Sequence, residues 1–79
     1  MWKISKINEI ISNYGFIKEK GVFKQVINNM LVYISLSIKK YTIDITVKSS
    51  AGNFYFPSID TYETLNKVVG LYKKRLLNE

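Results

Sequence analysis

The sequence contains neither cysteine nor histidine. This absence excludes disulfides, zinc sites of the usual cysteine and histidine kind, and nucleophiles that an imidazole activates. No cofactor or metal is therefore expected. Because disulfides persist mainly in oxidising compartments, a chain without cysteine favours the cytoplasm, which is that of the host cell if the source is viral.

Phosphate-binding loops and paired catalytic carboxylates are missing as well. The 4 glycines lie too far apart for a G-x-G-x-x-G or Walker motif. Among the 6 acidic residues, only Asp60 and Glu63 are close in sequence, and their spacing predicts a helix capping box. Asp44 is expected on an open sheet face, without a cleft that would shift its pKa. We therefore do not expect an enzyme.

The sequence also lacks a long apolar run. The longest, residues 30–34, is far short of the roughly 20 residues that a membrane-spanning helix needs. Asn8 and Glu9 interrupt the apolar N-terminal segment, so no cleavable signal peptide is expected. Trp2 and nearby lysines could place the first helix on a membrane surface, but its isoleucine stripe suits a helix that covers a sheet. Membrane binding is not expected.

The strongest pattern in the sequence is an alternation of apolar and polar residues over positions 30–47. Such an alternation is typical of strands with one buried face, and it breaks only at Lys39 and Lys40. We predict a hairpin with these two lysines at its tip, which would place Leu36 opposite Ile43. A slip of one residue would turn the whole apolar set to water, so the register is expected to be well specified.

Further strands are predicted on both sides of this hairpin. Residues 22–27 predict a strand that ends in a tight turn at residues 28–29, two asparagines that tolerate positive φ. Residues 54–56 predict a short fourth strand that Pro57 ends, at an edge of the sheet. Residues 16–21 are expected to form a charged connection.

Apolar residues three and four positions apart predict a helix at each end of the chain. The first covers residues 3–14, and the second follows the capping box that begins at Asp60. The chain, residues 1–79, is therefore expected to be a single small α+β domain. Its element order is α-β-β-β-β-α, with an antiparallel meander sheet and both helices packed on one face.

Charge is the one positive indication of function. The chain has 12 basic and 6 acidic residues, a net charge of +6, which favours anionic partners such as nucleic acid. Lys, Ile, Asn and Tyr together make up 35 of 79 residues, a bias typical of AT-rich genomes. The source is thus expected to be an AT-rich microbe, a phage, a virus or a plasmid.

The leading hypothesis is a small non-enzymatic module that binds nucleic acid or a nucleoprotein complex. Tyr33 and Tyr55, predicted on the open face of the sheet, would stack on bases. Lysines near the first strand, at the hairpin tip and on the sheet would contact phosphates: Lys18, Lys20, Lys24, Lys39, Lys40 and Lys48.

The alternative is a small protein-binding inhibitor of the anti-defence or host-takeover type. It would act through the sheet face or a sheet edge. The same open face is expected to expose Val22, Val26, Leu31 and Tyr33, and exposed apolar residues of this kind mark protein interfaces. Because the core of so short a chain is small, self-association through this face or through an edge strand, as a homodimer, is also expected.

Overall fold

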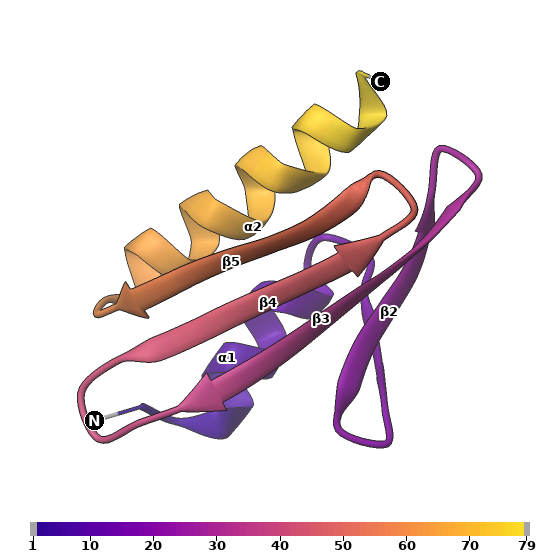
Figure 1. Ribbon diagram of the computed structural model, residues 1–79. Helices are drawn as coiled ribbons and strands as arrows, with labels where there is room; N and C mark the ends of the chain where they lie inside the picture. Colours follow the sequence, from indigo (N-terminus) through magenta and orange to yellow (C-terminus); the bar gives the residue numbers. More distant parts are fainter. Residues whose placement is uncertain (1, 79) are drawn as a thin grey trace.

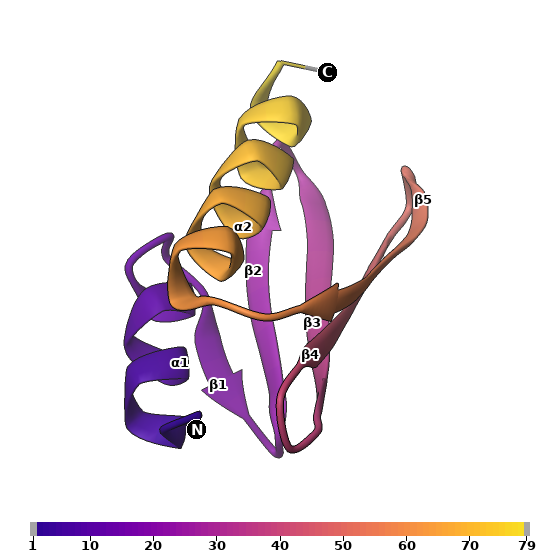
Figure 2. The ribbon, with the colours of Figure 1, turned by 90° about the vertical axis from the view of Figure 1, so that its left-hand side faces the viewer.

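Five antiparallel strands follow one another between two helices in the computed structural model, which describes residues 2–78 (Figure 1). The sheet order is β1-β2-β3-β4-β5, so each strand pairs with its neighbours in sequence. Both helices lie on the same side of the sheet, as two perpendicular views show (Figures 1 and 2). The elements are α1 (Ile4–Ser12), β1 (Ile17–Glu19), β2 (Val22–Ile27), β3 (Met30–Ile38), β4 (Ile43–Ser49), β5 (Gly52–Ile59) and α2 (Tyr62–Leu77).

A single hydrophobic core fills the space between the sheet and the helices. The alternating residues of the predicted hairpin supply its sheet side, and Val32, Ile34 and Ile45 are almost completely buried. The helices contribute the stripes that the sequence predicts, with Ile7 and Ile11 from α1 and the following residues from α2: Leu65, Val69, Tyr72 and Leu76. The predicted α+β fold, with an antiparallel meander and both helices on one face, is confirmed.

The first strand was not predicted, and the sheet has five strands where four were expected. Residues 16–21 contain β1, which pairs with β2 so that Glu19 lies opposite Val22. Lys20 and Gly21 make the two-residue turn, and both have positive φ, as a type I′ hairpin requires. A three-residue edge strand with one isoleucine carries no alternation, so the pattern of the sequence could not reveal it.

The central hairpin has the predicted faces but a register that differs by two residues. Leu36 lies opposite Ile45 and not Ile43, and Lys39 and Lys40 belong to a four-residue connection closed by a hydrogen bond from the Lys39 N–H to the Thr42 carbonyl. A two-residue turn would need positive φ at both lysines, which is unfavourable for residues with a Cβ. A shift of two preserves the face of each residue that stays in the strands, but it leaves Tyr41 outside them.

The last strand continues past the proline that was expected to end it. Pro57 lies within β5, an edge strand, where its missing N–H is tolerated. Ile45 pairs with Phe56 and Ile43 with Ile59, so β5 carries an extra residue opposite Asp44 and forms a bulge. The predicted edge position is confirmed, and the predicted end of the strand is wrong.

The cap of α2 also differs from the prediction. Thr61, and not Asp60, is the N-cap residue, and its hydroxyl accepts a hydrogen bond of 3.0 Å from the Thr64 N–H. Glu63 remains in the first turn, where its negative charge suits the helix dipole. Neither helix within residues 2–78 is both long and apolar enough to cross a membrane.

Candidate functional site

Three cross-strand neighbours form a basic-aromatic row on the outer face of the sheet, the face turned away from the helices. Tyr33 on β3 lies opposite Lys24 on β2 and opposite Lys48 on β4. The Lys24 ammonium lies 5.9 Å from the centre of the Tyr33 ring and forms an ion pair of 3.1 Å with Glu19. The row Lys24–Tyr33–Lys48 thus combines an aromatic ring with a lysine on each side.

Tyr55 provides a second aromatic ring on the same face. It lies opposite Thr46, one row further along the sheet, and is 60% exposed. Its hydroxyl donates a hydrogen bond of 3.0 Å to the Asp44 carboxylate. This bond fixes the ring at the edge of the sheet while leaving most of its surface in water.

Asp44 is buried on the outer face, contrary to the expectation that it lies open. The bulge in β5 folds over it, so that the Ser58 N–H donates a hydrogen bond of 2.9 Å, and the Lys39 ammonium lies 3.0 Å away. The Ser58 N–H, the Lys39 ammonium and the Tyr55 hydroxyl together hold the pKa of Asp44 below its usual value, although burial opposes them. Asp44 thus fastens the β3–β4 connection to the edge strand.

The other candidate lysines lie away from the row. Lys18 faces α1, because it lies opposite inward-pointing Phe23 and its ammonium is 3.4 Å from the Asn8 amide oxygen. Lys20 lies in the β1–β2 turn. Lys39 and Lys40 lie in the β3–β4 connection, and Lys39 forms an ion pair with Asp44.

The candidate interface residues are only partly brought together. Val26 lies opposite Leu31, and these side chains are 66% and 47% exposed, so together they form an apolar corner. Val22 lies beyond Lys24 on the same strand, opposite Glu19, and is partly buried. The row therefore separates Val22 from the corner of Val26 and Leu31.

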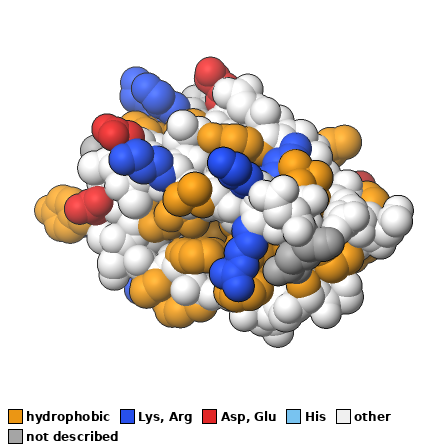
Figure 3. Space-filling model, turned by 90° about the horizontal axis from the view of Figure 1, so that it is seen from above, with side chains coloured by type: hydrophobic (Ala, Val, Ile, Leu, Met, Phe, Trp, Pro, Cys, Tyr) orange, Lys and Arg blue, Asp and Glu red, His pale blue; other side chains and the backbone are white. Residues whose placement is uncertain are grey.

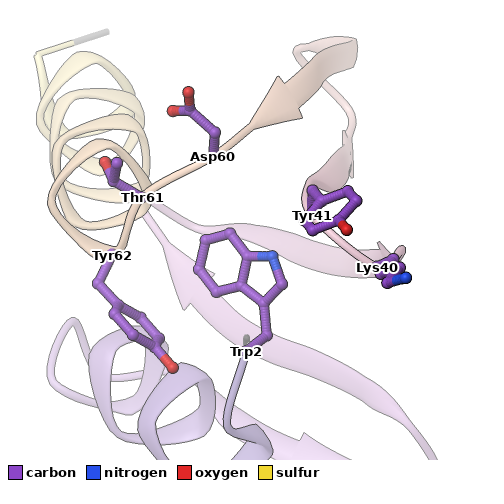
Figure 4. Close-up of a pocket in the computed structure, with 6 residues that line it drawn as sticks. All are labelled: Trp2, Lys40, Tyr41, Asp60, Thr61 and Tyr62. Atoms are coloured by element: carbon purple, nitrogen blue, oxygen red, sulfur yellow. The ribbon is translucent and has the colours of Figure 1, made fainter.

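An end pocket of about 200 Å³ lies where the N-terminal segment, the β3–β4 connection and the start of α2 meet (Figure 4). Three aromatic rings line it, and Trp2 stands between Tyr62 on one side and Tyr41 on the other. Trp2 meets Tyr62 edge to face, with ring centres 4.9 Å apart. The remaining lining residues are Lys40, Asp60 and Thr61.

Sequence reasoning did not find the end pocket, because its residues come from three distant parts of the chain. Tyr41 was predicted on the buried face of the hairpin, but the shifted register releases it, and it is 74% exposed. Trp2 carried one signal, since it lies off the isoleucine stripe predicted for the first helix and was therefore expected to cover the end of the sheet or to lie at an interface.

A second hollow, of about 180 Å³, lies between β5 and α2. Hydrophobic side chains gather on this side of the molecule beside basic ones, and acidic side chains lie toward its periphery (Figure 3). Tyr72 at the base of the hollow is 6% exposed, and its hydroxyl has no hydrogen-bond partner among residues 2–78. The lining residues are Phe56, Val68, Leu71, Tyr72 and Arg75.

Neither a metal site nor a similarity to a known protein assigns a function to these surfaces. Within the described part of the chain, no three acidic, histidine or cysteine side chains come together as a metal site. Comparison with protein-family models, with curated proteins and with solved structures finds no match to this chain. The row, the corner and the end pocket are therefore the features of the molecule that point to a function.

Proposed function

We propose that this protein is a small non-enzymatic module that binds nucleic acid in single-stranded form, alone or within a nucleoprotein complex, through the outer face of its sheet. The observation that supports the proposal is the row Lys24–Tyr33–Lys48, an aromatic ring between two lysines on neighbouring strands. Single strands suit such a surface because every base offers a face for stacking and every nucleotide a phosphate. The net charge of +6 attracts the same ligand from a distance.

The spacing of the two outer tyrosines fits several nucleotides. Tyr33 and Tyr55 belong to β3 and β5, two strands that lie about 10 Å apart on either side of β4, and Tyr55 is two residues further along the sheet. Thr46 lies on β4, between these two strands, and is the direct neighbour of Tyr55. Two bases of one strand therefore find stacking platforms on this face, with Lys24 and Lys48 beside the first.

A salt titration tests the proposal. The affinity for a fluorescently labelled single-stranded oligonucleotide is measured by anisotropy for the wild type and for the double variant Lys24→Gln, Lys48→Gln. Each phosphate contact contributes about 0.7 to the slope of log affinity against log salt, so the double variant should reduce the slope by about 1.4.

The matched control is the double variant Lys67→Gln, Lys74→Gln, which removes the same charge from exposed positions of α2. It should leave the slope nearly unchanged. Equal effects of the two double variants would mean that net charge alone attracts the oligonucleotide. An oligonucleotide that does not bind the wild type would refute the proposal.

The corner of Val26 and Leu31 supports a second candidate, a protein-binding inhibitor from a phage, virus, plasmid or other mobile element that acts as a homodimer. Adjacent apolar side chains with 66% and 47% exposure gain nothing from a phosphate backbone but gain free energy when another protein covers them. Light scattering at several concentrations should then show a dimer that Leu31→Lys dissociates. Leu77→Lys is the control, because Leu77 is 58% exposed at the far end of α2. A wild type that is monomeric at every concentration argues against this candidate.

A further inference from the structure

The end pocket presents aromatic faces in a setting that is positively charged. Tyr62 is held in place, because its hydroxyl accepts a hydrogen bond of 2.8 Å from the Lys3 N–H and the Lys6 ammonium lies 4.9 Å from its ring centre. Trp2 packs against Tyr62 and is thereby oriented. Across the pocket, the Lys40 ammonium lies 5.3 Å from the centre of the Tyr41 ring.

These contacts determine which ligand the rings can accept. A cationic guest, which aromatic rings often bind, would meet the like charges of Lys6 and Lys40. Among residues 2–78, Asp60 is the one carboxylate that lines the pocket, and its side chain points away from Trp2 (Figure 4). A flat, neutral ring attached to a negative charge fits both the aromatic faces and the lysines.

We propose that the end pocket binds one unstacked nucleobase, which inserts between Trp2 and Tyr41 while Lys40 contacts the adjoining phosphate. This inference rests on the proposed function and names the part of the ligand that leaves the sheet. The volume agrees, because cavities of about 150 Å³ accommodate benzene and the end pocket measures about 200 Å³. It has room for a single base and not for a base pair.

The exposure of Tyr41 is the clearest sign of this role. A ring that is 74% exposed in a short connection gains little from packing, yet the connection is fixed by the Lys39–Asp44 ion pair and by the Lys39–Thr42 hydrogen bond. Tyr41 is thus an exposed ring on a connection whose backbone is held in place. A base that stacks on this ring would bury the aromatic surface that the folded protein leaves in water.

Trp2 makes the test direct, because it is the only tryptophan of the chain and its fluorescence reports the pocket alone. Adenosine monophosphate is titrated against the protein, with ribose 5-phosphate as a ligand that has the charge but no base. Adenosine monophosphate should quench Trp2, and ribose 5-phosphate should not. A single-stranded oligonucleotide should quench it as well.

Two variants separate the pocket from the sheet. Tyr41→Leu should weaken oligonucleotide binding by about fivefold or more and reduce the quenching by adenosine monophosphate, while Tyr41→Phe should retain both. Because Tyr41 is exposed and outside the strands, neither substitution should alter the circular dichroism spectrum. Tyr33→Leu should weaken binding of the oligonucleotide but leave the quenching of Trp2 by adenosine monophosphate unchanged.

The outcomes distinguish this inference from the proposed function. An oligonucleotide that binds by anisotropy without quenching Trp2, or that binds Tyr41→Leu as well as the wild type, overturns the base pocket and leaves the sheet proposal intact. Equal quenching by ribose 5-phosphate also overturns it. Quenching by adenosine monophosphate without oligonucleotide binding supports the base pocket and refutes the sheet proposal.

Discussion

The Tyr14 ring, just after the end of α1, packs against Gly70 of α2, where the absence of a side chain leaves room for the ring. A Cβ at position 70 would lie 2.8 Å from the Tyr14 hydroxyl, closer than real contacts allow. The same hydroxyl donates a hydrogen bond of 2.7 Å to the Asn66 amide oxygen, which keeps the ring in place. Gly70 therefore allows the close contact between α2 and the Tyr14 ring that follows α1.

The first prediction follows from this contact between Gly70 and Tyr14. Alanine at an exposed helix position is favoured over glycine by about 1 kcal/mol, but overpacking costs about 1–3 kcal/mol. We expect Gly70→Ala to lower the free energy of unfolding, by up to about 2 kcal/mol, as measured by urea denaturation. In a Tyr14→Ala background the same substitution should become stabilising. A Gly70→Ala variant that is more stable than the wild type would show that Tyr14 does not approach Gly70 this closely.

The second prediction concerns Asp44 and pH. Because the folded protein lowers the pKa of Asp44, its contribution to stability is present above the unfolded pKa of about 3.9 and is lost as the pH falls toward the lower folded pKa. Asp44→Asn should therefore lower the melting temperature most near neutral pH. The difference from the wild type should shrink steadily below about pH 4.

The control for this prediction is Glu63→Gln, which removes an exposed carboxylate that pairs with Lys67 at 3.7 Å. Surface pairs of this kind contribute little, so its effect on the melting temperature should be small at every pH. A constant difference between wild type and Asp44→Asn from pH 7 to pH 3 would show that the charge of Asp44 is not what stabilises the fold.

The third prediction tests the position of the α2 cap. Thr61→Ala removes the hydroxyl that accepts the Thr64 N–H and should cost about 1 kcal/mol of unfolding free energy. Asp60→Asn should change it by a few tenths at most, because Asp60 lies outside the cap. If chemical denaturation finds Asp60→Asn the more harmful of the two, the helix begins at the capping box that the sequence predicts.

The apolar pattern of the strands is a local signal, whereas their register is not. Alternation along the strands determines the buried face. A slip of two residues, such as the one that places Leu36 opposite Ile45, leaves the face of each residue that stays in the strands unchanged. Hydrophobic pattern therefore predicts the core but not the register, which depends on the conformation of the Lys39–Thr42 connection. The short strand β1 lacks a pattern because its outward Ile17 is 71% exposed and its inward residue is a lysine.

The candidate sites differ in how far the sequence could reveal them. Alternation alone places Lys24, Tyr33 and Lys48 on the outer face of the sheet. Their alignment in one row depends on the register, because the predicted hairpin would have placed Lys48 opposite Leu31, whereas it lies opposite Tyr33. The end pocket joins Trp2, Tyr41 and Tyr62 across most of the chain. Its prediction requires the helix positions and the true register, and both depend on packing.

The final prediction concerns the Tyr72 hydroxyl. Tyr72 packs against Phe54 and Phe56, with ring centres 5.3 and 6.2 Å apart, and its buried hydroxyl has no partner within residues 2–78. An unsatisfied buried hydroxyl costs about 1–3 kcal/mol, so Tyr72→Phe, which keeps both ring contacts, should raise the free energy of unfolding. Tyr62→Phe is the matched control, because it removes a hydroxyl that accepts the Lys3 N–H and should lower stability by about 0.5–1.5 kcal/mol. Thermal and urea unfolding of the two variants should therefore move in opposite directions. Loss of stability in Tyr72→Phe would mean that the hydroxyl has a partner in solution, such as a water molecule in the hollow between β5 and α2.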